Sequence, residues 1–202
     1  MAGRSSLPEV VAEHVASGYR DGRTIARRVR AYLSLPVAAE PEIAREVEQA
    51  IAVKRAAIAA WPPETDCDRL DRAFAALWAD RIVALQNAGF TRSDGHESVD
   101  DEARAHPAAW GYCFFHQQDL ERAVRNQGLA LAFGVVRPGE RDDADAGRAV
   151  CAALVAAGLA PVWSGEPRQR IALPTLVWRR RGPEVGVALR REAGARAAHF
   201  SA

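Results

Sequence analysis

The chain has 202 residues, of which 49% are hydrophobic and 26% charged, and its formal net charge is +1 at pH 7. This length suffices for one domain with a sizeable core plus an appendage, or for two small domains. The nearly neutral charge excludes a polyanion-binding surface spread over the whole molecule. Lys54 is the only lysine among 27 basic residues, and this preference for arginine, with abundant alanine, indicates a GC-rich bacterial genome.

The cysteines and the hydropathy pattern limit the cellular compartment. Cys67, Cys113 and Cys151 are odd in number and widely separated, which predicts neither a disulfide framework nor a paired metal site. No stretch approaches the roughly 18 consecutive apolar residues of a membrane span, and the first residues lack the apolar core of a signal peptide. We therefore expect a cytoplasmic protein with no membrane association, no cofactor and no bound metal.

The first 60 residues have apolar side chains at helical spacing throughout. We expect one helix ending before Asp21-Gly22, a second with Thr24 as its cap, and a third over residues 41–60. The sequence Trp61-Pro62-Pro63 cannot continue a helix, because two consecutive prolines force an extended link. It separates an N-terminal helical segment, residues 1–63, from the rest of the chain.

The remainder alternates strands with helices. A helix capped by Asp66 or Asp68 comes first. Further helices are expected over residues 119–126 and 146–157, and strands over 82–85, 112–115, 129–136, 161–164, 170–173 and 175–179. The strand, helix and strand between residues 112 and 136 predict a parallel, right-handed crossover.

The predicted fold class is α+β, with a mixed sheet of about five strands flanked by helices and preceded by the N-terminal helical segment. The sheet domain is expected over residues 64–181. Residues 182–202 then form a C-terminal tail, either frayed or docked as a helix.

Polar side chains follow the expected strand 112–115 at a strand-to-helix junction, where function is often found. They are His116, Gln117, Gln118 and Asp119. Asp119 in a first helical turn equally suits a helix cap, and His116 equally suits a satisfied structural histidine. We expect the His116 side chain to lie at a polar crevice near Asp94 or Asn87, outside the apolar core.

A second group of candidates lies in the loop after the strand 82–85. Its members are Gln86, Asn87, Arg92, Ser93 and Asp94. Donors and acceptors of this kind suit a binding loop, and they also suit an ordinary turn with a helix cap. If the sheet brings both groups to one edge, they form a polar pocket at the strand ends.

Several separate blocks of sequence occur in an order that resembles a known family. They are TDCDRLDRAFAAL (65–77), IVALQNAGFTRSDG (82–95), GYCFFHQQDLERAV (111–124), GLALAFG (128–134) and RIALPTLVWRRR (170–181). The chain resembles the bacterial family called domain of unknown function 6891 (DUF6891), and the resemblance covers roughly residues 65–181. Relatives carry a cluster of cysteines in the loop that here reads FTRSDG, and this chain has none of them, so the resemblance implies no metal ligands here.

Two hypotheses for function follow. The leading one is a non-catalytic cytosolic binding or interaction protein, which recognises a small molecule or a protein with the loop and the junction. The alternative is a small hydrolase with His116 as base, oriented by Asp94 or Asp119. Nucleic acid is disfavoured as a partner, because glutamates follow the arginines Arg27, Arg28 and Arg30 closely.

Overall fold

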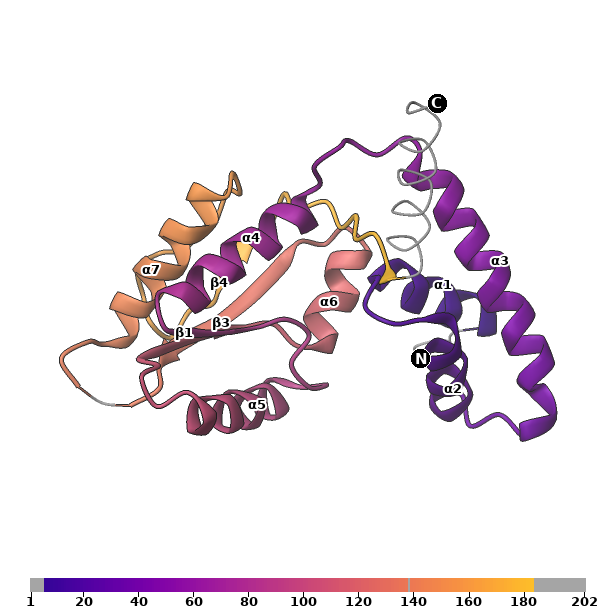
Figure 1. Cartoon of the computed structure of the whole chain (residues 1–202), viewed down its shortest axis with the longest axis horizontal. Helices are drawn as coiled ribbons and strands as arrows, with labels where there is room; N and C mark the ends of the chain where they lie inside the picture. The colour runs from indigo at the N-terminus through magenta and orange to yellow at the C-terminus, as the bar shows by residue number, and fades with distance from the viewer. Residues whose placement is uncertain (1–5, 138, 184–202) are drawn as a thin grey trace, which may run out of the picture. The chain divides into compact units, whose positions relative to one another are not determined.

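The structure, a computed structural model, describes residues 6–137 and 139–183. The chain divides into two compact units (Figure 1). The first combines residues up to Pro63 with those from Arg179 onward, and the second is Glu64–Trp178. Most of the expected tail, from residue 184 onward, lies outside the described residues.

The first unit is helical, with α1 (Leu7–Ser17), α2 (Gly22–Tyr32), the 3-10 turn η1 (Val37–Ala39) and α3 (Glu40–Ile58). The three expected helices are thus confirmed. Their buried faces share one apolar cluster, which includes Val11, Ile25, Val29, Ile43 and Val47. Each helix buries one stripe of side chains at helical spacing, and this burial makes the arrangement stable.

The cap of α2 differs from the expectation. Asp21 is the N-cap, and its carboxylate accepts a hydrogen bond of 2.7 Å from the backbone N–H of Thr24. Thr24 already lies inside the first turn, so its own side chain is too far along the helix to cap it.

Residues from the end of the described chain complete this unit. The Arg180 guanidinium lies over the Tyr19 ring, 4.6 Å from its centroid. Arg181 Nη2 donates to the carbonyl of Pro62 at 2.6 Å. The helical unit is therefore assembled from two segments that the whole second unit separates in sequence.

The second unit contains a four-stranded mixed sheet in the order β1 (Ile82–Leu85), β2 (Gly111–Phe114), β3 (Leu129–Val135) and β4 (Ile171–Leu173). Strands β1 and β2 are parallel, and the other neighbours are antiparallel. The mixed α+β sheet is confirmed, but the expected strand count was slightly high. Val162 contributes only an isolated bridge to Ala172, and Pro174, which has no N–H to donate, ends β4 in a turn.

The expected parallel crossover between residues 112 and 136 is wrong, because β2 and β3 are antiparallel. They are joined through α6 (Gln117–Val124), which has eight residues and spans only about 12 Å. The chain reverses direction across α6, and β3 re-enters the sheet at the end where β2 leaves it. The parallel connection runs instead from β1 to β2 through α5 (Arg92–Ala105).

Helices cover both faces of the sheet (Figure 1). Val99 and Ala103 of α5 pack on Phe114 at one face. Helices α4 (Asp66–Ala79) and α7 (Asp143–Ala156) lie on the other. The N-cap of α4 is Thr65, not Asp66 or Asp68 as expected, since Thr65 accepts from the N–H of Asp68 while Asp68 accepts in return. Within the two described ranges, no helix is both long and apolar enough to cross a membrane.

Candidate functional site

The structure brings the two predicted polar segments side by side. Because β1 and β2 are parallel, the loop after β1 and the junction after β2 leave the same edge of the sheet. Two backbone hydrogen bonds join them, from Ala88 N–H to Phe115 O at 2.9 Å and from Gln117 N–H to Gly89 O at 3.0 Å. The two segments thus form one continuous piece of structure.

The loop is shorter than expected, because α5 begins at Arg92. Arg92 and Ser93 are exposed in its first turn. The carboxylate of Asp94 accepts from the backbone N–H groups of Phe90 and Thr91, both at 2.9 Å. These two hydrogen bonds hold the pKa of Asp94 below its ordinary value. Asp94 therefore serves as one half of a capping box for α5.

His116 and Asp119 occupy the corresponding capping-box positions at the start of α6, but both residues are buried. They are only 6% and 3% exposed. The side chain of His116 is therefore buried, whereas the sequence predicted that it lies in a polar crevice outside the core. Asp119 Oδ2 accepts from the His116 backbone N–H at 3.3 Å and lies 3.1 Å from Nε2. The other half of the box falls short of a hydrogen bond, and Nδ1 has no partner among the described residues.

The main partner of Asp119 is Arg170, which the sequence did not indicate. Its Nη1 and Nη2 donate to the two carboxylate oxygens at 2.8 and 2.5 Å. Nη2 also donates to the carbonyl of Ala130 at 2.6 Å. The two residues are 51 positions apart, so no local spacing pattern pointed to the pair.

The electrostatics of this cluster favour a neutral imidazole. Burial lowers the pKa of His116; the Asp119 charge opposes this effect, and the nearby Arg170 adds to it. A neutral ring donates from Nε2 to Asp119, while the other nitrogen lies in the interior. A general base needs a nitrogen that a substrate can reach. The geometry instead makes the pair part of the support of α6.

The remaining predicted residues have different environments. Gln86 Nε2 donates to Asp71 at 2.7 Å, and Gln117 Nε2 donates to Glu121 at 3.3 Å. Asn87 adopts a positive φ of 54°, and its buried Oδ1 has no hydrogen-bond partner in the described chain. Gln118 is exposed.

The cysteines and potential metal ligands form no centre either. Burial raises the pKa of the Cys113 thiol, which is fully buried in β2 and therefore stays protonated. Over residues 6–137 and 139–183, no group of three or more His, Cys, Asp and Glu side chains could hold a metal ion.

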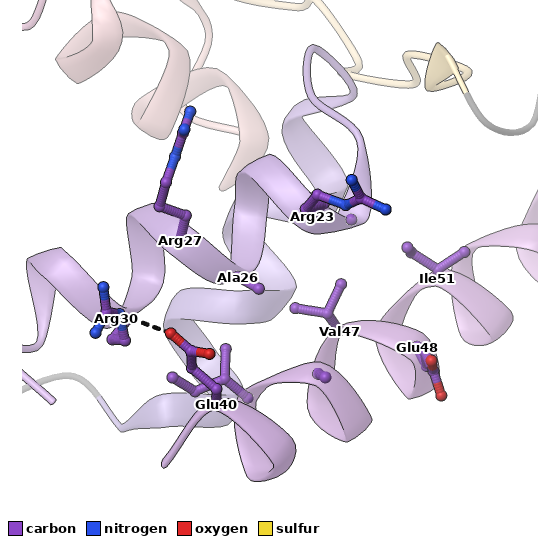
Figure 2. Close-up of a pocket in the computed structure, with 11 residues that line it drawn as sticks. Arg23, Ala26, Arg27, Arg30, Glu40, Val47, Glu48 and Ile51 are labelled. Carbon is purple, nitrogen blue, oxygen red and sulfur yellow. Dashed lines mark ion pairs between the residues drawn. The ribbon is translucent and has the colours of Figure 1, made fainter. Parts of the chain in front are cut away.

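A groove between α2 and α3 was not anticipated from the sequence (Figure 2). Its volume is about 640 Å³, and small or apolar side chains form its floor: Ala26 from α2, with Ile43, Ala44, Val47 and Ile51 from α3. Ala44 is exposed and Ile51 is half-buried. The groove lies wholly within the helical unit. The helical spacing of these apolar residues was visible in the sequence, but it predicts a buried face equally well.

The lips of the groove are charged. Arg23, Arg27 and Arg30 follow one another along α2, and Glu40 and Glu48 stand on α3. Arg30 Nε and Glu40 form an ion pair of 3.5 Å, which bridges the two helices (Figure 2).

The family model called domain of unknown function (DUF6891) matches residues 2–182. The chain belongs to this family. No curated protein and no solved structure matches it.

The DUF6891 match is wider than the resemblance seen in the sequence, which began at about residue 65. It includes α1, α2 and α3. The groove therefore lies inside the matched part of this DUF6891 chain, together with the sheet and the Asp119 cluster.

Proposed function

We propose that this DUF6891 protein is a non-catalytic cytoplasmic binding protein that takes up a helical segment of a protein partner in the groove between α2 and α3. One observation carries the proposal: a hollow of about 640 Å³ whose floor is apolar and partly open. Apolar surface of this kind gains free energy when a partner removes it from water. Two-helix grooves lined in this way suit the apolar face of an amphipathic helix.

The state of the polar cluster supports a non-catalytic role. Asp119 is committed to Arg170 and to the N-terminus of α6, and Asp94 caps α5. Each carboxylate that was expected to orient His116 in a hydrolase therefore has a structural task. The exposed members of the predicted surface, Arg92, Ser93 and Gln118, are proposed to be available for secondary contacts.

The test uses the full chain and a fluorescein-labelled model peptide of 18 residues that forms a helix with a leucine stripe and glutamine elsewhere. Ala44→Trp fills the floor of the groove, and the exposed side chain of Ala44 makes this change compatible with folding. Ala52→Trp is the control, because Ala52 is exposed on the same helix but does not line the groove. We expect the peptide to bind the wild type and Ala52→Trp equally, and Ala44→Trp at least tenfold more weakly by fluorescence anisotropy. Equal binding by all three proteins would remove the groove as the site.

A further inference from the structure

We infer that the partner helix carries acidic residues along the flank that faces α2. This inference rests on the proposed function, and it specifies the chemistry of the partner for that same groove. Three properties of the groove support it: its length, its small floor residues and the unequal charge of its two lips.

The length and floor of the groove suit a helix. Its lining along α3 runs from Glu40 to Ile51, which corresponds to about 16 Å, or three helical turns. Ala26 and Ala44 present only methyl groups from the two facing helices. Small side chains allow a partner backbone to come close, and the half-buried Ile51 offers apolar contact beside them.

The α2 lip is the more strongly charged one. Arg23, Arg27 and Arg30 recur at the spacing of one helix face. Arg27 has neither a hydrogen bond nor an ion pair to a described residue, and Arg23 has only an electrostatic effect on Asp21. Two guanidinium groups are thus free to pair with carboxylates of a bound helix.

The negative charges on the α3 side of the groove disfavour other anionic partners, such as nucleic acid. Glu48 stands across the apolar floor from the arginines, and Glu40 already neutralises Arg30. A nucleic-acid backbone carries charge on all sides, so Glu48 would repel it and the floor would contact nothing apolar. A helix with one acidic flank and an apolar stripe satisfies the arginines and keeps its carboxylates away from Glu48.

The test compares three labelled peptides with the same leucine stripe, which differ only in one flank: glutamate, glutamine or lysine. We expect the full chain to bind the glutamate peptide about fivefold more tightly than the glutamine peptide, since two exposed ion pairs give an effect of this size. The lysine peptide should bind more weakly than both. Raising NaCl from 0.05 to 0.5 M should remove the advantage of glutamate.

Matched variants locate the effect. The double variant Arg23→Gln/Arg27→Gln should bind the glutamate and glutamine peptides equally, with unchanged affinity for the latter. Arg28→Gln is the control, because Arg28 is exposed on the same helix but does not line the groove. It should retain the fivefold preference. Thermal melts establish that each variant is folded.

The possible failures are distinguishable. If the wild type binds glutamate and glutamine peptides equally and Ala44→Trp abolishes both, the groove is a binding site and the acidic partner is wrong. If no peptide binds, the proposed function itself fails. A dimer of the full chain that Ala44→Trp dissociates would make a second copy the occupant. Duplex DNA that displaces the glutamate peptide would likewise overturn the inference.

Discussion

The guanidinium group of Arg170 meets the carboxylate of Asp119 through two hydrogen bonds, of 2.8 and 2.5 Å, across 51 positions of sequence. A third hydrogen bond, from the same guanidinium group to the carbonyl of Ala130, fixes the orientation of that group. The pair therefore connects the first turn of α6 with β3 and with the start of β4. A carboxylate that is only 3% exposed is tolerated because these donors surround it.

Arg170→Met should lower the free energy of unfolding by about 2 to 3 kcal/mol, because it leaves Asp119 buried without its main partner. This value is below the usual range for fully buried pairs, since the Arg170 side chain is 28% exposed. Adding Asp119→Asn to Arg170→Met should restore part of the loss, as the buried charge disappears. Urea unfolding of the two single variants and the double variant measures the coupling, and strictly additive losses would contradict it.

His116→Ala should cost about 2 to 4 kcal/mol, because it creates a cavity and removes a donor to Asp119. His116→Asn should cost clearly less, since asparagine is a favourable N-cap residue and keeps a donor. Urea melts with an unchanged denaturant slope provide the comparison. A loss below 1 kcal/mol for His116→Ala would show that the residue is not part of the packed core.

Stability should fall as the pH is lowered from 7 to 5. Burial lowers the pKa of His14, His96 and His116, so in this window the unfolded chain takes up protons that the folded chain resists. Above pH 7.5 these groups are neutral in both states and contribute no slope. The lowered pKa of Asp94 gives stability that is lost only at more acidic pH.

Because asparagine does not titrate, His116→Asn should show a shallower decline than the wild type between pH 7 and 5. Urea titrations at half-unit intervals of pH test this. A decline of the same slope in the variant would assign the effect to the other two histidines.

Gly95→Ala should lower stability by about 1 to 3 kcal/mol, because a Cβ at this position would overlap the ring of Phe114. Gly95 is thus the point at which the first turn of α5 contacts the sheet. Gly139→Ala is the matched control, since a Cβ there would meet nothing within 4 Å. The control should change stability by less than about 0.5 kcal/mol. Thermal unfolding of the three proteins provides the comparison, and equal melting temperatures would contradict the close contact.

The sequence predicted most helices and all four strands of the described sheet, because each has its own local hydrophobic pattern. Features that depend on distant residues were beyond it. Arg170 lies far along the chain from Asp119, and the direction of β3 depends on how α6 packs. The sequence raised the adjacency of the loop and the junction only as a condition on the sheet order, and the parallel pairing of β1 with β2 that produces it was not predicted. The burial of His116 was not predicted either. The groove could not be predicted, because the apolar residues of a helix have the same spacing whether that face of the helix is exposed or buried.

The domain division stays a prediction that a fragment can test. Residues 64–178 should fold alone, with a cooperative urea transition and circular dichroism of a mixed α/β protein. The fragment must include Thr65, since its side chain caps α4 and losing a cap costs about 1 kcal/mol. A fragment from residue 66 should melt at a lower temperature. Absence of a cooperative transition in 64–178 would show that the helical unit completes the core of the sheet.

The return of Arg180 and Arg181 to Tyr19 and Pro62 has a consequence for how the chain is made. The ribosome releases α1, α2 and α3 first, but the residues that finish their unit emerge only after the entire sheet has been synthesised. Until then the nascent helices lack these contacts. A nascent chain in which Trp178 has left the exit tunnel but Arg180 has not would thus have a complete sheet and an unfinished helical unit. Protection of that helical unit from proteases should rise only when Arg180 and Arg181 emerge from the tunnel.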